Sequence, residues 1–84
     1  MKILMADGHQ TFSGTPVQIV TKMRRLYNRW KENPLNSNGE YMLGVIERMG
    51  YGPNIGQGHL SEEEKCESFV RFLINEGMAK VIVE

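Results

Sequence analysis

The sequence has little of what marks several large classes of protein. Cys66 is the only cysteine in 84 residues, which excludes an intrachain disulfide and the small secreted domains that several disulfides hold together. No hydrophobic run reaches the roughly 18 residues that a membrane-spanning helix needs. The first ten residues, MKILMADGHQ, are too short an apolar stretch for the core of a signal peptide. We therefore expect a cytoplasmic protein without a membrane partner.

Net charge is also absent, because ten basic residues balance ten acidic ones. The charges are nevertheless divided along the chain: residues 1–31 hold six basic residues and one acidic residue, and residues 32–84 hold four and nine. This division fits either a molecule with one basic and one acidic face or two surfaces that neutralise each other. The hydrophobic content of 40% is ordinary for a globular protein, and a chain of this length has room for one core. We expect a single domain over residues 1–84.

A β-hairpin is predicted near the N-terminus and a further strand near the C-terminus. Asp7-Gly8 separates KILMA from HQTF, and this dipeptide favours the positive φ angles of a tight primed turn. The segment MAKVIVE, residues 78–84, is rich in β-branched residues and most simply adds a strand beside the N-terminal one. The expected sheet has three strands and is antiparallel or mixed.

Three helices are predicted between the hairpin and the last strand. A Ser or Thr followed three residues later by Gln or Glu is typical of a helix start, and it occurs in TPVQ, SNGE and SEEE, at residues 15, 37 and 61. Asn33-Pro34 should end the first helix, and Gly50 and Gly77 should end the others in the left-handed conformation. We expect helices near residues 16–31, 38–49 and 62–76. The predicted fold is α+β, in the order β-β-α-α-α-β, with the helices packed on the sheet.

Each predicted helix has an apolar side when its residues are projected at about 100° per residue. In the third helix Phe72 and Ile74 lie on the two flanks of that side and make it wider than one packing face needs. Either this helix is central in the fold, which we prefer, or Phe72 and Ile74 belong to an apolar surface for a partner. The expected core residues are Ile19, Val20, Met23, Leu26, Tyr27 and Trp30, then Tyr41, Met42, Val45, Ile46 and Met49, then Cys66, Phe69, Val70 and Leu73.

The segment KMRRLYNRWK, residues 22–31, contains five basic residues and no acidic one. On a helix, Lys22, Arg25 and Arg29 form a basic stripe opposite the core side, with Arg24 and Lys31 on its flank. The stripe could follow a nucleic-acid backbone or dock on an acidic protein surface. We favour a third interpretation, a solvated helix face, because Arg and Lys are common on such faces.

The segment GYGPNIGQGH, residues 50–59, has four glycines but does not match a phosphate-binding loop. It follows a helix, has a different glycine spacing and lacks the Gly-Lys-Ser/Thr of a P-loop. We interpret it as a mobile connector whose side chains could contact a partner. The candidate residues of the loop are Tyr51, Asn54, Gln57 and His59.

No catalytic, metal or cofactor site is indicated. His9 and His59 are far apart and have no cysteine or carboxylate at a recognised metal-ligand spacing. Cys66 falls on the core side of its helix, where a lone cysteine is usually a small buried hydrophobe. No two carboxylates are marked as an acid and base pair. We expect a protein that is not an enzyme and needs no cofactor.

The chain resembles a family of short uncharacterised bacterial and phage-borne proteins. The resemblance rests on SGTPxxIVxxM at residues 13–23, YMxxVxxR at residues 41–48 and SFxxxLxxxGM at residues 68–78, and the loop at residues 50–59 departs from it. It implies the same fold and no established activity. The expected function is a small intracellular module that binds or regulates an unidentified protein partner; the alternative is nucleic-acid binding through the basic stripe.

Overall fold

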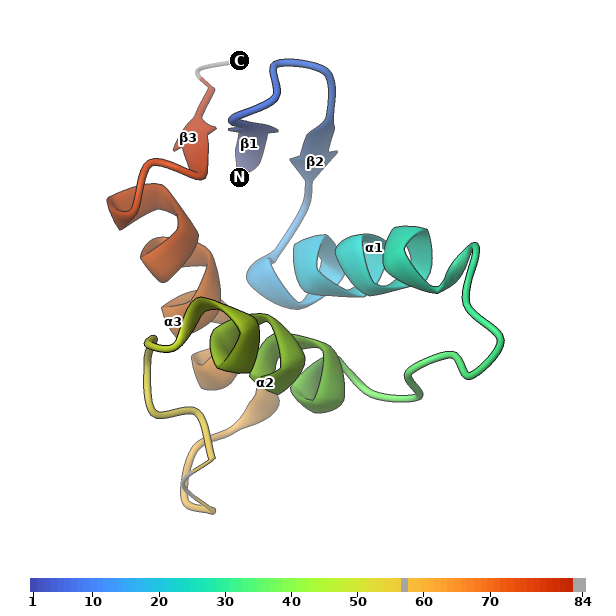
Figure 1. Cartoon of the computed structure of the whole chain (residues 1–84). Helices are drawn as coiled ribbons and strands as arrows, with labels where there is room; N and C mark the ends of the chain where they lie inside the picture. Colours follow the sequence, from blue (N-terminus) through green and yellow to red (C-terminus); the bar gives the residue numbers. More distant parts are fainter. Residues whose placement is uncertain (57, 83–84) are drawn as a thin grey trace.

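The sheet of the computed structural model consists of three short antiparallel strands. The structure describes residues 1–56 and 58–82. Strand β1 (Lys2–Met5) lies between β2 (Thr11–Ser13) and β3 (Ala79–Val81) and pairs antiparallel with both (Figure 1). The predicted position of the last strand beside the first is confirmed.

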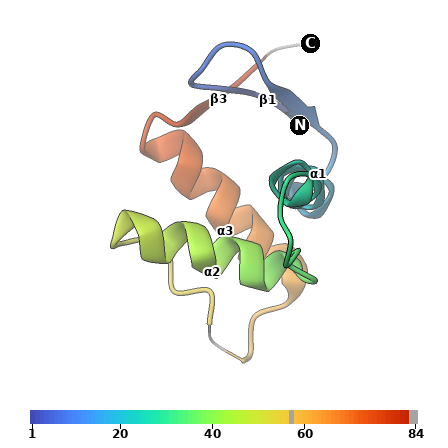
Figure 2. The ribbon, with the colours of Figure 1, turned by 45° about the vertical axis from the view of Figure 1, so that its right-hand side comes forward.

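The three helices lie together on one side of this sheet (Figures 1 and 2). They are α1 (Pro16–Asn28), α2 (Asn38–Met49) and α3 (Glu62–Asn75). Helix α3 contacts α1, α2 and β3, so the central position that we preferred for it is observed. The predicted α+β fold and its element order are confirmed.

The loop of the hairpin is longer than predicted. Strand β1 ends at Met5 and β2 begins at Thr11, so residues 6–10 connect them instead of Asp7-Gly8 alone. The Asp7 carboxylate accepts hydrogen bonds from the amides of His9 at 2.9 Å and of Gln10 at 3.3 Å. Only Gly8 takes a positive φ in this loop. The prediction of a tight primed turn is wrong, because the Asp7 side chain closes a wider loop.

The predicted helix starts are observed at residues 15, 37 and 61. Thr15 and Gln18 form a reciprocal capping box, and so do Ser61 and Glu64. The hydroxyl of Ser37 accepts from the amide three residues later, which is the first half of such a box. In each case the side chain satisfies a backbone N–H that the helix leaves free, which is why these short polar residues begin the helices.

Helix α1 ends three residues before the predicted position, and residues 29–31 lie outside it. The side chain of Asn28 pairs with the backbone of Leu35: its amide donates to the carbonyl at 2.8 Å, and its carbonyl oxygen accepts from the N–H at 2.9 Å. This pairing turns the chain before Pro34 can end the helix. Gly50 and Gly77 take φ values of 82° and 75° after α2 and α3, as predicted.

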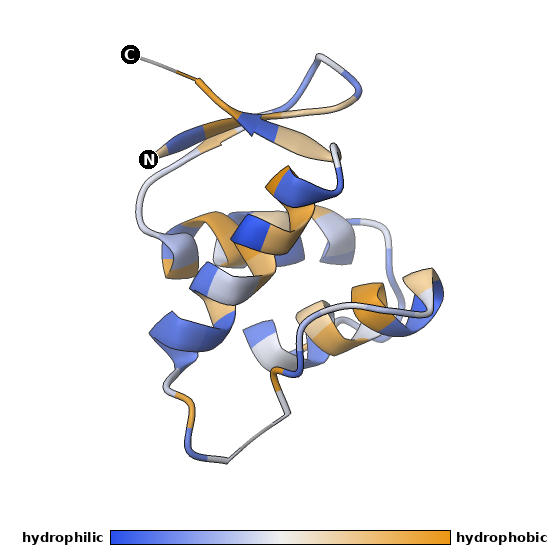
Figure 3. Cartoon of the chain, turned by 90° about the vertical axis from the view of Figure 1, so that its left-hand side faces the viewer, coloured by the Kyte–Doolittle hydropathy of each residue, from blue (hydrophilic) through white to orange (hydrophobic). Residues whose placement is uncertain are grey.

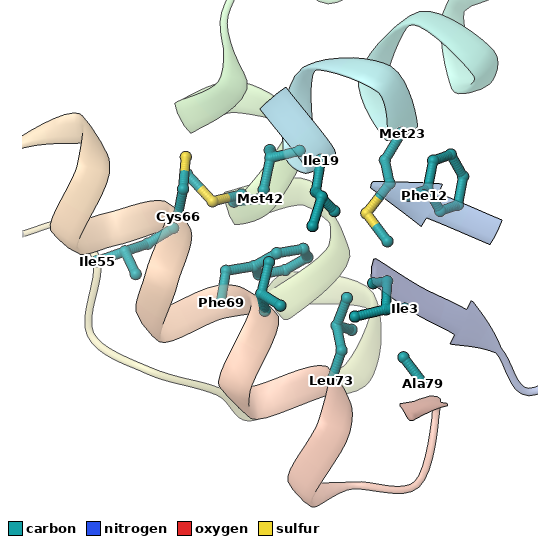
Figure 4. Packing of buried hydrophobic residues seen from close by; sticks show 12 residues of the cluster. Ile3, Phe12, Ile19, Met23, Met42, Ile55, Cys66, Phe69, Leu73 and Ala79 are labelled. Carbon is teal, nitrogen blue, oxygen red and sulfur yellow. The ribbon is translucent and has the colours of Figure 1, made fainter. Parts of the chain in front are cut away.

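The core lies between the sheet and the helices, where Phe69 of α3 is almost fully buried (Figure 4). In Figure 3 each helix carries both hydrophobic and hydrophilic residues, in agreement with its amphipathic pattern. Loop residue Ile55 also enters the core. The buried apolar residues are Ile3, Phe12, Ile19, Val20, Met23, Met42, Ile55, Cys66, Phe69, Val70, Leu73 and Ala79.

Two of the expected core residues are exposed. The side chain of Trp30 is 84% exposed and that of Leu26 is 37% exposed, so their assignment to the core is wrong. The helical projection no longer applies to Trp30, because the chain leaves α1 at Asn28. Tyr27 and Tyr41 are half-buried at the edge of the core.

Candidate binding surface

The five basic candidates differ in the surroundings of their side chains. The Lys22 side chain is hydrogen-bonded within the fold: its Nζ donates to the carbonyl oxygen of the last residue of β2 at 2.7 Å. Arg24 is half-buried with its Nε enclosed. Arg25 is exposed on the helix, whereas Arg29 and Lys31 follow its last residue. Arg29 and Lys31 thus place two exposed positive charges just after the last residue of α1.

A cluster of cations and aromatic rings forms at this end of the helix. We call Tyr27, Arg29, Trp30, Lys31 and Arg48 the cation–aromatic cluster. The Nζ of Lys31 lies 4.8 Å from the centroid of the Tyr27 ring, and the guanidinium carbon of Arg48 lies 5.3 Å from the same centroid. The guanidinium carbon of Arg29 lies 5.5 Å from the centroid of the Trp30 ring. These distances are those of cation–π contacts.

Sequence reasoning missed Arg48. It lies in the last turn of α2, where a cation also interacts favourably with the helix dipole. Its meeting with Tyr27 depends on the packing of α2 against α1, which no local pattern reveals. To predict this contact, one would have had to know that the C-terminal halves of α1 and α2 lie side by side.

A series of edge-on aromatic contacts connects the cluster to the core. The rings of Tyr27 and Tyr41 meet edge-on with their centroids 5.7 Å apart, and those of Tyr41 and Phe69 do so at 6.2 Å. Such edge-on pairs add to the stability that area burial alone gives. The surface ring of Tyr27 is thus held in place by the buried ring of Phe69 through Tyr41.

The electrostatic environment of the cluster is positive. A hydrogen bond from Arg48 Nη1 to the Tyr27 hydroxyl oxygen, at 3.4 Å, lowers the pKa of Tyr27, and nearby Lys31 lowers it further. Burial raises the pKa of Tyr41. Within residues 1–56 and 58–82 the one ion pair joins Arg71 to Glu67, so no described carboxylate is paired with a cation of the cluster.

A small pocket opens beside the cluster, and Tyr27 belongs to both. Its volume is about 190 Å³, and its lining is mainly apolar, with Phe12, Leu26, Tyr27 and Tyr41 among the lining residues. The exposure of Leu26 is explained by its place in this wall. The surface can therefore offer positive charge and an apolar recess side by side.

The flanks of α3 are partly covered by the chain itself. Phe72 and Ile74 are half-buried and pack against the core. The Tyr51 ring meets the Phe72 ring edge-on with centroids 5.6 Å apart, and its hydroxyl donates to Glu76 Oε2 at 2.7 Å, which raises the pKa of Tyr51. The Phe72 ring is therefore shielded on one side, while Ile74 lines a shallow groove beside β3.

The loop after α2 is anchored at two further places. Ile55 is 3% exposed, and the backbone of Gly52 lies so close to α2 that an added Cβ would come within 2.8 Å of Ile46. Asn54 and His59 are exposed. The candidate residue Gln57 lies outside the described residues.

The described residues also bear on metal binding and on the reactivity of Cys66. In the described part of the chain, no three His, Cys, Asp or Glu side chains are grouped to hold a metal ion. Burial, with a smaller contribution from Glu62, raises the pKa of the Cys66 thiol to about 11, which opposes formation of a reactive thiolate. No helix formed by the described residues has the length and apolar character needed to cross a membrane.

Comparison with protein-family models, with curated proteins and with solved structures found no match to this chain. The family resemblance in the three sequence patterns stays a prediction.

Proposed function

We propose that this chain is a small non-catalytic binding module whose cation–aromatic cluster docks on an acidic segment of a partner protein. The observation that carries the proposal is the exposure of Trp30, whose ring lies in water with Arg29 beside it. Trp, Tyr and Arg are the residues that contribute most to binding in protein interfaces. All three occur here within a few residues of one another.

Charge supports an acidic partner. The cluster holds three cations, and no described carboxylate is paired with any of them. Complementary charge speeds the encounter of two proteins and selects among partners. A partner segment that carries Asp or Glu beside apolar residues would pair with the cations and at the same time bury the Trp30 ring.

Single-stranded nucleic acid is the second candidate, and the pairing of Trp30 with Arg29 favours it. Proteins that bind single strands combine cations with aromatic rings on which bases stack. Such sites stack several successive bases, whereas Lys31 and Arg48 already lie over the Tyr27 ring. The Trp30 ring also has a cation over it, from Arg29, but it is 84% exposed and is the one ring of the cluster open enough for a base; we therefore prefer the protein partner.

The test compares two fluorescent probes by anisotropy at low salt: a short peptide rich in Asp, Glu and Phe, and an oligothymidine. We expect the peptide to bind, and Trp30→Ala to weaken binding at least about fivefold, because interface tryptophans typically contribute more than 1 kcal/mol. Leu43→Ala is the matched control, since Leu43 is an exposed apolar residue of α2 outside the cluster. Equal affinities of Trp30→Ala and wild type would refute the proposal, and binding of the oligothymidine alone would replace it with the second candidate.

A further inference from the structure

Two cations converge on the phenol of Tyr27 without a described acid to compensate them. Lys31 comes from the segment after α1 and Arg48 from the last turn of α2, so different parts of the fold bring them to one ring. Arg48 Nη1 lies 3.4 Å from the Tyr27 hydroxyl oxygen, at the long end of hydrogen-bond distances. Both groups carry a positive charge, and an anion that contacts both beside the phenol would compensate it.

We infer that Tyr27, Lys31 and Arg48 form a receptor for one carboxylate of the partner, and that the pocket beside Tyr27 takes the apolar side chain next to that carboxylate. This inference rests on the proposed function and specifies its ligand. The ammonium, the guanidinium and the phenol O–H are all hydrogen-bond donors, which a carboxylate matches because both of its oxygens accept. The guanidinium can also engage a carboxylate through two parallel N–H groups.

The size of the pocket suits one side chain. Its volume of about 190 Å³ is smaller than the roughly 300–1,000 Å³ of typical small-molecule sites. Aromatic and aliphatic groups from Phe12, Leu26 and Tyr41 form its walls, which favours an apolar occupant. Because Tyr27 belongs to both the pocket and the receptor, the apolar residue and the acidic residue of the ligand must be neighbours.

The aromatic part of the receptor, the Tyr27 ring, is positioned before the ligand arrives. The edge-on contacts from Tyr27 through Tyr41 to Phe69 hold the phenol ring against the core, and Phe69 is 1% exposed. A site held in its binding geometry loses less conformational entropy when it is occupied. A fixed site should also distinguish ligands by the order of their residues more strongly than by their total charge.

The experiment uses the whole chain and two peptides of identical composition. In one peptide each Phe is next to an Asp, and in the other Ser residues separate every Phe from every acid. Calorimetric titration should show the first peptide binding at least about fivefold more tightly, since one apolar contact and one charged hydrogen bond depend on the order. Amide chemical shifts of Phe12 and Tyr41 should change on addition of the first peptide.

Two variants test the receptor directly. We expect Arg48→Gln to weaken binding of the first peptide at least about tenfold, the lower end for a hydrogen bond to a charged group, and Tyr27→Phe to weaken it about twofold while leaving the ring in place. Arg71→Gln removes a cation from an exposed site on α3 and should leave the affinity unchanged. Circular dichroism establishes that each variant is folded.

The outcomes separate this inference from the proposed function. If Trp30→Ala abolishes binding while Arg48→Gln and Tyr27→Phe do not change it, the inferred receptor is wrong and the proposed docking surface stands. If the two peptides bind equally well, the adjacency of acid and apolar group is wrong. If neither peptide binds wild type at low salt, both proposals are wrong, and binding of an oligothymidine that Arg48→Gln weakens would assign the site to phosphate.

Discussion

The side-chain amide nitrogen of Asn38 lies 2.9 Å from the hydroxyl oxygen of Thr21 and donates a hydrogen bond to it across the contact of α2 with α1. The same nitrogen donates to Glu62 Oε1 at 3.2 Å, so the first residue of α2 also joins α3. Asn38 is 5% exposed, and the Thr21 hydroxyl in turn donates to the carbonyl of Val17. One buried amide therefore connects all three helices, and Asn38 is the one buried polar residue among those that the structure describes.

Replacing Asn38 by Asp should destabilise the fold by about 3 kcal/mol, the scale for a buried charge without a partner. The carboxylate cannot donate to Thr21, and it faces the carboxylate of Glu62. The measurement is urea unfolding followed by circular dichroism. Asn36→Asp makes the same change at an exposed residue nearby and should alter stability by less than about 0.5 kcal/mol. Identical urea midpoints for the two variants would contradict the role given to Asn38.

Gly52→Ala should destabilise the protein by about 1–3 kcal/mol, the usual cost of overpacking. The new methyl group would meet two carbons of Ile46, at 2.8 Å and 3.0 Å, and push the loop away from α2. Gly58→Ala in the same loop is the matched control, because its added Cβ meets nothing within 4 Å. Thermal unfolding of the two variants checks this prediction, which fails if both melt together.

Trp30→Ala should change the free energy of unfolding by less than about 0.5 kcal/mol, because a side chain that is 84% exposed contributes little packing. Phe69→Ala, by contrast, should cost about 3–5 kcal/mol, since it leaves a cavity in the core. Urea unfolding at equal protein concentration compares the two. A large loss of stability in Trp30→Ala would mean that the ring packs on the fold.

Cys66 should make stability fall with pH between about 9 and 11. The unfolded chain releases the thiol proton near its ordinary pKa of 9.0, whereas burial holds the folded thiol protonated up to a pKa of about 11. In this window the unfolded state binds fewer protons, so the free energy of unfolding decreases as pH rises; below pH 9 the thiol contribution is fully present. The readout is the difference in unfolding free energy between wild type and Cys66→Ala, which should narrow from pH 9 to pH 11. A constant difference would show that the thiol is not buried.

Local signals in the sequence predicted most of the fold. Thr15 and Ser61 accept hydrogen bonds from amides three residues away, and Gly50 and Gly77 themselves adopt a positive φ. A short window of sequence therefore contains all the residues involved. The apolar side of α3 was predictable for the same reason. The predictions that failed concern features that depend on a residue farther along the chain. The end of α1 is one of them, because Asn28 pairs with Leu35, seven residues later.

The candidate surface was predicted in part. The basic segment at residues 22–31 contains four of the five members of the cation–aromatic cluster, but the helical projection placed Tyr27 and Trp30 among core residues and spread the cations over a stripe. The early end of α1 leaves Trp30 outside the helix and exposed, whereas Tyr27 stays in α1 at the edge of the core. Arg48 comes from another helix, and its contact with Tyr27 follows from tertiary packing that local patterns do not encode.

Trp30 is the only tryptophan of the chain, and its indole lies in water when the protein is folded. Its emission should therefore differ little between the native and the urea-unfolded protein, so intrinsic fluorescence will be a poor probe of folding here. Occupation of the surface would place the indole in a drier environment and shift its emission to shorter wavelength. The fluorescence of Trp30 should thus report binding of a partner and be insensitive to unfolding.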